Sequence, residues 1–89
     1  MKSVSIIVRG KVQGVWFRAS TAETARKIGI KGFVRNLPDG TVYIEAEADE
    51  HTLAALIAWC REGSPFAEVS SLTVEEIEPA GFSSFEVSA

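Results

Sequence analysis

The sequence predicts an α+β fold in which two helices pack on one face of an antiparallel sheet. The clearest observation is strict alternation over residues 41–48, which is typical of a strand with one buried face; its apolar members are Val42, Ile44, Ala46 and Ala48. Two segments with helical spacing separate such strands. The chain has 89 residues, 46 % of them hydrophobic, which fits a single domain over 1–89 with one core.

The first half begins with a strand and a helix. Ser3–Arg9 is rich in β-branched residues and predicts a strand with Val4, Ile6 and Val8 on one face. Gly10–Gly14 predicts a loop, and Trp16–Ile28 a helix that Gly29 ends. Ser20-x-x-Glu23 matches a capping box, but a start just after Gly14 fits equally well. Whether Arg18 lies on this helix or before it therefore stays open.

The second half adds four strands and one helix. Ile30–Leu37 and Thr41–Ala48 predict strands joined by a turn at Leu37–Gly40, with Thr41, Tyr43, Glu45 and Glu47 facing solvent. Asp49 is a candidate N-cap for an amphipathic helix that buries Leu53, Leu56, Ile57 and Cys60 and ends at Gly63-Ser64-Pro65. Val69–Ile77 and Phe82–Val87 predict the last two strands. This order, β-α-β-β-α-β with a short final strand, is the ferredoxin-like split βαβ arrangement.

The order of elements also predicts where a site could form. Two strands joined through a helix in one sheet run parallel, so their carboxyl ends open on the same edge. We therefore expect the Gly10–Arg18 loop to face the residues around Asn36, although about eighteen positions separate them in the sequence.

Charge and composition exclude several classes of protein. The net charge is −3, but residues 1–40 have a net charge of +6 and residues 41–89 one of −9. General nucleic-acid binding is disfavoured, whereas a local cationic site for a small anion is not. One cysteine and one histidine exclude an internal disulfide and an ordinary zinc site. With no apolar run near the ~20 residues of a membrane span and no signal-peptide core, we expect a cytoplasmic protein.

The glycine-rich loop is the main candidate for chemistry. Backbone N–H groups at a strand–loop–helix junction, backed by the helix dipole, form an anion cradle, and Arg18 adds a planar fork of donors. The lysine-serine/threonine pair of a nucleotide P-loop is missing. On spacing alone, an arginine near a helix start such as Arg18 is more often a solvated surface charge. Asn36 could cap the following turn, or its amide could position a water or a substrate oxygen.

The cradle contains no side chain that is an evident general acid, general base or nucleophile. His51 is predicted to be exposed and Cys60 to be packed in the core, and the carboxylates of the second half to be solvent-facing. An enzyme with this inventory could only bind an anion, stabilise charge and orient water. That suffices only for a substrate that is already activated by a good leaving group.

Two motifs resemble the signatures of the acylphosphatase family. Gly10-Lys11-Val12-Gln13-Gly14-Val15-Trp16-Phe17-Arg18 matches the pattern G-x-V-Q-G-V-x-F-R, and Gly32-Phe33-Val34-Arg35-Asn36 followed by Gly40-Thr41-Val42 resembles the second signature. Gly63, Pro65, Ala67 and Val69 resemble the later Gly-Pro…Ala-x-Val stretch, with Ser64 where proline is more usual. The resemblance covers essentially the whole chain.

The resemblance implies hydrolysis of acyl phosphates to a carboxylate and inorganic phosphate, without a metal or organic cofactor. It implies that Arg18 holds the phosphoryl oxygens together with backbone N–H groups of Gln13, Gly14, Val15, Trp16, Phe17 and Arg18. Asn36 would orient the attacking water, and the phosphate of the substrate would accept its proton. The expected partner is a small acyl phosphate rather than nucleic acid or membrane, and the expected state is a monomer.

Three alternatives remain. One is a binding module that holds a regulatory anion without turnover. Another is an RNA-recognition domain, which needs exposed aromatics on a basic sheet face, whereas Tyr43 is flanked by Thr41, Glu45 and Glu47. The third is the acylphosphatase-like domain of carbamoyl-transferring hydrogenase maturation proteins, which are long multidomain chains with zinc-finger-like cysteines. The 89-residue chain, taken as complete, argues against that class.

Overall fold

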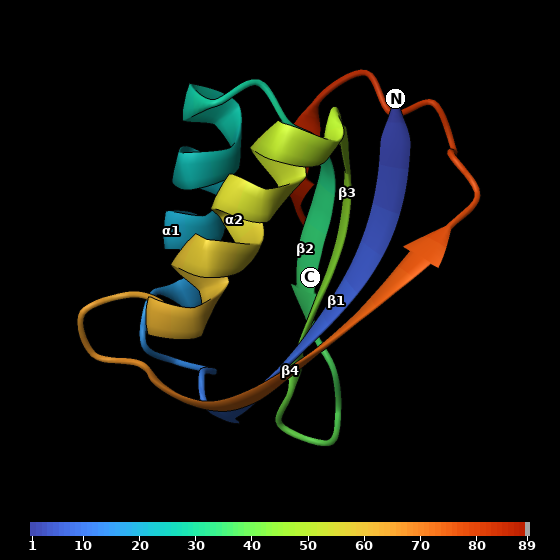
Figure 1. Ribbon diagram of the computed structural model, residues 1–89. Coiled ribbons are helices and arrows are strands. Elements are labelled where there is room, and N and C mark those ends of the chain that lie inside the picture. Colours follow the sequence, from blue (N-terminus) through green and yellow to red (C-terminus); the bar gives the residue numbers. More distant parts are fainter. Residues whose placement is uncertain (89) are drawn as a thin grey trace.

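The computed structural model describes residues 1–88 and shows two helices packed on one face of a five-stranded sheet (Figure 1). The strands are β1 (Lys2–Lys11), β2 (Lys31–Asn36), β3 (Val42–Ala48), β4 (Glu68–Ile77) and β5 (Phe85–Val87). The helices are α1 (Phe17–Lys27) and α2 (Glu50–Glu62). The predicted α+β class and order of elements are confirmed.

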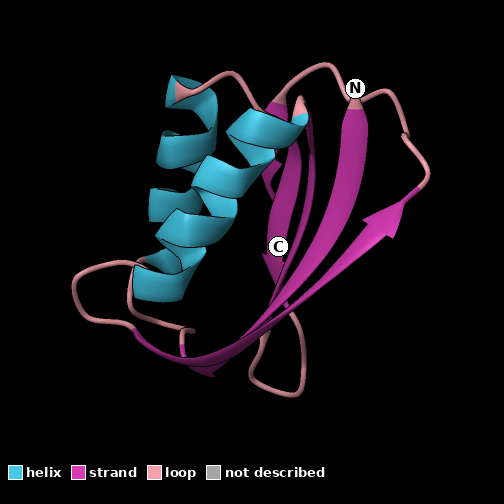
Figure 2. Ribbon diagram, in the orientation of Figure 1, coloured by secondary structure: helices cyan, strands magenta, loops and turns pink. Residues whose placement is uncertain are grey.

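The strand order across the sheet is β4-β1-β3-β2-β5. Both β1 and β2 pair antiparallel with β3, so they run parallel to each other, as the crossover argument predicts. The sheet is not purely antiparallel, because β5 pairs in parallel with β2. The last strand reaches that edge after crossing from β4 at the opposite edge (Figure 2).

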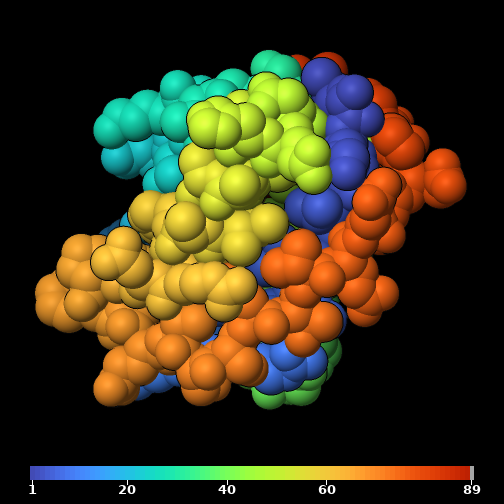
Figure 3. Space-filling model, viewed as in Figure 1, coloured from blue at the N-terminus to red at the C-terminus, as the bar shows by residue number. Residues whose placement is uncertain are grey.

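The core lies between the sheet and the helices. Ile6 and Val8 of β1 and the alternating apolar residues of β3 are buried there, and α2 contributes Leu53, Leu56 and Cys60. Asp49 accepts a hydrogen bond from the Thr52 N–H at 2.8 Å, which confirms it as the N-cap of α2. In the space-filling view α2 lies between α1 and β4 and covers this face (Figure 3). Within residues 1–88, neither helix has the length and apolar character that crossing a bilayer requires.

The other face of the sheet departs from the simple alternation that the sequence suggests. Glu47 was expected to face solvent but is 3 % exposed, because the connection from β4 to β5 covers it. Phe33 packs against both Tyr43 and Phe82, with ring centroids 5.9 and 5.7 Å apart. The aromatic side chains on this face are therefore packed together and do not form the open platform of an RNA-recognition domain.

Two loops lie at one end of the sheet. The connection from β1 to α1 and the turn from β2 to β3 both extend from the lower end in Figure 1. The predicted meeting of the Gly10–Arg18 segment with the end of β2 is thus confirmed, and it is here that the candidate site is found.

Candidate active site

The loop before α1 has an unusual backbone. Trp16 is the N-cap of α1 with φ 65° and ψ 15°, a left-handed conformation that costs a non-glycine residue roughly 1–2 kcal/mol. It has no side-chain cap, and the first backbone bond of the helix runs from the Ser20 N–H to the Trp16 carbonyl at 3.0 Å. The capping-box start at Ser20 is therefore wrong, and Arg18 is the second residue of α1.

Backbone donors are concentrated at this helix start. No N–H group of residues 13–18 donates a hydrogen bond to any residue in the described part of the chain. Such orphan donors, together with the positive end of the helix dipole, favour an anion. The first turn of α1 contains no acidic side chain that would compete for them.

Arg18 projects from α1 toward β2 and β5. It is half-buried, and its Nη1 donates to the Ser88 carbonyl at 2.9 Å. Ser88 in turn donates its N–H to the Val34 carbonyl of β2 at 2.8 Å. This contact with the segment after β5 fixes the guanidinium across the cavity from the loop. Arg18 is therefore not a freely solvated charge.

Asn36 is the last residue of β2 and pairs with Val42 of β3. Its Oδ1 is buried and has no hydrogen-bond partner among residues 1–88. The turn is instead closed by Asp39, whose carboxylate accepts from the Thr41 N–H and hydroxyl at 3.0 and 2.6 Å. The turn-capping alternative for Asn36 is not observed, and a buried oxygen without a partner calls for another explanation.

Gln13 joins the two halves of the site. Its Nε2 donates to the Leu37 and Thr41 carbonyls, each at 2.8 Å. The sequence predicts a role only for the backbone of Gln13, because this side-chain contact spans 24 and 28 positions and has no local signal. The bond fixes the loop relative to the turn that follows Asn36.

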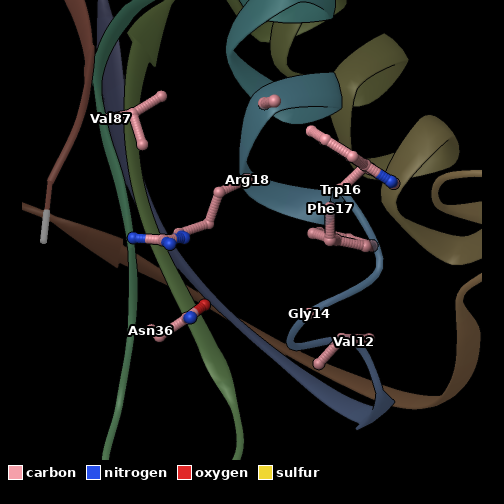
Figure 4. A pocket seen from close by; sticks show the side chains of 8 residues that line it. Val12, Gly14, Trp16, Phe17, Arg18, Asn36 and Val87 are labelled. Carbon is pink, nitrogen blue, oxygen red and sulfur yellow. The ribbon is translucent and has the colours of Figure 1, made fainter.

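These elements enclose a cavity of about 360 Å³ (Figure 4). Figure 4 shows the Arg18 guanidinium and the Asn36 amide facing the same space, opposite the loop. Five of the predicted site residues line it, namely Gly14, Trp16, Phe17, Arg18 and Asn36. Three further residues line it that the sequence does not predict, namely Val12, Ala19 and Val87.

Two predicted residues do not line the cavity. Gln13 turns its side chain to the β2–β3 turn, and the Val15 carbonyl accepts a hydrogen bond from Ser64 at 2.8 Å. The Gln13 side chain and the Val15 carbonyl are therefore engaged by neighbouring elements. Trp16 lies at the cavity and is 75 % exposed, and Phe66 is 72 % exposed; neither exposure is predicted by the sequence.

Other reactive side chains lie outside this cavity. His51 is exposed in the first turn of α2, and Cys60 is buried in the core, where desolvation raises the pKa of its thiol to about 12. The residues that line the cavity include no carboxylate and no imidazole. Across residues 1–88, no three His, Cys, Asp or Glu side chains are grouped so that they could hold a metal ion.

Comparisons with known proteins agree with this geometry. The family model for acylphosphatase matches residues 4–87. An acylphosphatase from Methylococcus capsulatus is 51 % identical over 88 residues, which is 98 % of this chain and 96 % of that protein. One from Thermococcus kodakarensis is 47 % identical over 98 % of both chains.

Solved structures show the same similarity. The crystal structure of acylphosphatase from Bacillus subtilis matches with a TM-score of 0.97 and 37 % identity, covering all of both chains. A part of Thermococcus kodakarensis HypF also matches, with a TM-score of 0.87 and 31 % identity, but only 12 % of that chain is covered. The family match spans both signature motifs and the cavity between them, so the chain belongs to the acylphosphatase family.

Proposed function

We propose that this cavity hydrolyses acyl phosphates, with the phosphoryl group held by the backbone N–H groups of residues 13–18 and by Arg18, and the water oriented by Asn36. Hydrolysis of acyl phosphates is the reaction of the family to which the chain belongs. The observation that most supports these residue roles is the buried Asn36 Oδ1, which lacks a partner among residues 1–88 and belongs to the same cavity as the Arg18 guanidinium. A buried acceptor needs a hydrogen-bond donor, and the Asn36 amide lies in the wall of the cavity.

The proposed step is an in-line displacement at phosphorus. The water oxygen forms a bond to phosphorus while the bond from phosphorus to the acyl oxygen breaks, and the carboxylate leaves with the electron pair. The proton of the water passes to a phosphoryl oxygen, so no protein base is needed. Catalysis then consists of positioning and charge stabilisation, which are the main contributions to phosphoryl transfer in general.

The test is hydrolysis of benzoyl phosphate, in the presence of a metal chelator, by the wild type, Asn36→Ala and Arg18→Lys. We expect rapid turnover by the wild type and inhibition by inorganic phosphate. Asn36→Ala should lower kcat by about 10²–10³-fold, the usual cost of removing one preorganised polar group. Arg18→Lys should also lose activity, because an ammonium group lacks the bidentate fork.

Arg35→Lys is the matched control for Arg18→Lys. Arg35 is exposed on the open face of the sheet, where its guanidinium lies 5.6 Å from the Tyr43 ring centroid, so the control should keep wild-type turnover. An active Arg18→Lys variant would overturn the role given to Arg18. Full turnover by a folded Asn36→Ala would overturn the role given to Asn36. A folded wild type that binds phosphate without turnover would instead be an anion-binding module.

We further propose that the enzyme acts as a monomer in the cytoplasm. All the groups assigned to the site come from one chain, since Arg18, Asn36 and Val87 line a single cavity. Light scattering at assay concentration tests this state, and a mass of twice 9.6 kDa would contradict it.

A further inference from the structure

The end of α2 supports the phosphate-binding loop from behind. Gly63 ends the helix with φ 74°, and a Cβ added there would lie 2.9 Å from Cε2 of Phe17. Ser64 follows and is 3 % exposed, and its hydroxyl donates to the Val15 carbonyl at 2.8 Å. Trp59 adds a ring contact to Phe17, with the centroids 5.4 Å apart. The corner at Gly63 and Ser64 thus contacts the loop directly, 49 positions away in the sequence.

The bond from Ser64 controls the direction of one specific donor. The Val15 carbonyl and the Trp16 N–H belong to one planar trans peptide, so they point in opposite directions. The loop lies between the end of α2 and Asn36 (Figure 4). Holding the Val15 oxygen toward Ser64 therefore turns the Trp16 N–H to the opposite side of the loop, where the cavity lies.

Without this bond, the observed orientation of the Val15–Trp16 peptide would be less favourable. Trp16 is the one non-glycine residue of the described chain with a positive φ, which is unfavourable for a large side chain. Neither a side-chain cap nor an acceptor within residues 1–88 fixes its N–H. The buried Ser64 hydroxyl supplies a specific contact that favours the observed orientation over a flipped peptide.

We infer that Ser64 is a positioning residue for phosphoryl binding, which acts by fixing the Val15–Trp16 peptide so that the Trp16 N–H faces the substrate. The inference rests on the proposed function of the cavity. Loss of one such hydrogen bond should weaken phosphate binding by about threefold to tenfold. Because bound substrate and inorganic phosphate both use the loop, KM and the phosphate inhibition constant should change more than kcat.

The experiment compares wild type, Ser64→Ala and Ser64→Cys. The cysteine is slightly larger than serine and leaves no cavity but is only a weak donor, so the test does not depend on whether the alanine variant folds. Ser3→Ala is the matched control, because Ser3 is also buried but pairs with Glu47 at the far end of the sheet. The readouts are inhibition of benzoyl phosphate hydrolysis by inorganic phosphate, and the shift of the Trp16 amide resonance during a phosphate titration.

We expect both Ser64 variants to raise KM and the phosphate inhibition constant by about threefold to tenfold and to reduce the Trp16 amide shift, with Ser3→Ala unchanged. Ser64 variants that bind phosphate like the wild type, even if they are less stable, would overturn the inference and leave the proposed function intact. A folded wild type that neither binds phosphate nor hydrolyses benzoyl phosphate would overturn the proposed function, and this assignment with it.

Discussion

At the scale of single residues, the amide of Gln13 is the link between the loop and the β2–β3 turn. In Gln13→Met the Leu37 and Thr41 carbonyls would lose their shared donor. We expect the free energy of unfolding to fall by about 1–3 kcal/mol, since two hydrogen bonds are lost while each carbonyl keeps its bond from the backbone N–H of Gly40 or Leu37. We also expect kcat to fall, because Asn36 directly precedes this turn. Urea unfolding and benzoyl phosphate hydrolysis measure the two effects.

Asp39→Ala is the control for Gln13→Met. It removes the contacts of Asp39 with Thr41 in the same turn but leaves the link from Gln13 in place. This exposed variant should keep the wild-type kcat. Equal losses of kcat in both variants would mean that the turn itself, and not its link to the loop, positions Asn36.

Glu47 is a buried carboxylate on the face of the sheet that the helices do not cover. Burial by itself raises the pKa of its carboxyl, but hydrogen bonds from the backbone N–H groups of Ala80, Gly81 and Phe82 outweigh this and hold the pKa below its usual value of 4.5. A pKa that is lower in the folded state stabilises the fold above the usual pKa, and this stability is lost as the pH falls through the folded-state pKa.

Glu47→Gln should therefore destabilise the protein near neutral pH and reduce the loss of stability on acidification. Urea unfolding at about pH 7 and about pH 3 measures the difference between the two conditions. Glu75 is exposed on β4, so Glu75→Gln should have the same free energy of unfolding as the wild type at both pH values. If the stability of Glu47→Gln fell on acidification as much as that of the wild type, a group other than Glu47 would be responsible for the acid dependence.

At the scale of elements, Gly32 allows β2 to approach β3. Its φ is 144°, and a Cβ added there would lie 1.9 Å from the Glu45 carbonyl oxygen. We expect Gly32→Ala to cost about 3 kcal/mol or more, because the backbone of β2 must move away from its partner strand. Thermal or urea unfolding measures the loss.

Gly29→Ala separates crowding from backbone strain. Gly29 has a φ of 82°, but a Cβ there would meet nothing within 4 Å. Its replacement should cost only the strain of a left-handed residue, roughly 1–2 kcal/mol. If the two variants lost equal stability, close approach of the strands would not be the reason for glycine at position 32.

The sequence predicted every strand and helix but not all of their ends. Val42 to Ala48 and the apolar stripe of α2 were recognisable because local periodicity reports burial against one face. The start of α1 was ambiguous because Trp16 has no side-chain cap, so its position depends on the fold of the loop and not on a local motif. Glu47 was misassigned because the segment that covers it lies more than thirty positions away.

The same distinction applies to the candidate site. Arg18 and Asn36 were predictable because their motifs and the crossover rule place them at one edge of the sheet. The contributions of Gln13, Ser64 and Ser88 were not, since each depends on a side chain that donates to a backbone carbonyl far away in the sequence. Such contacts leave no periodic signal in the sequence.

At the scale of the whole molecule, Cys60 reports on opening of the core. It is the single cysteine of the chain, it is fully buried, and desolvation raises the pKa of its thiol to about 12. A thiol reagent should therefore label the native protein only through unfolding, whereas the urea-unfolded chain should react at once. The dependence of the labelling rate on urea should match that of global unfolding. A rate independent of urea would instead indicate local opening of α2.

The position of β4 has a consequence for contacts between molecules. This ten-residue strand forms one edge of the sheet, so half of its backbone donors and acceptors face outward and could pair with a strand of another copy. Its exposed side chains include Glu68, Glu75 and Glu76, which would bring like charges together in such a pairing. The acidic character of the second half of the chain thus protects the sheet against growth into aggregates, a protection that acid would remove by neutralising the carboxylates.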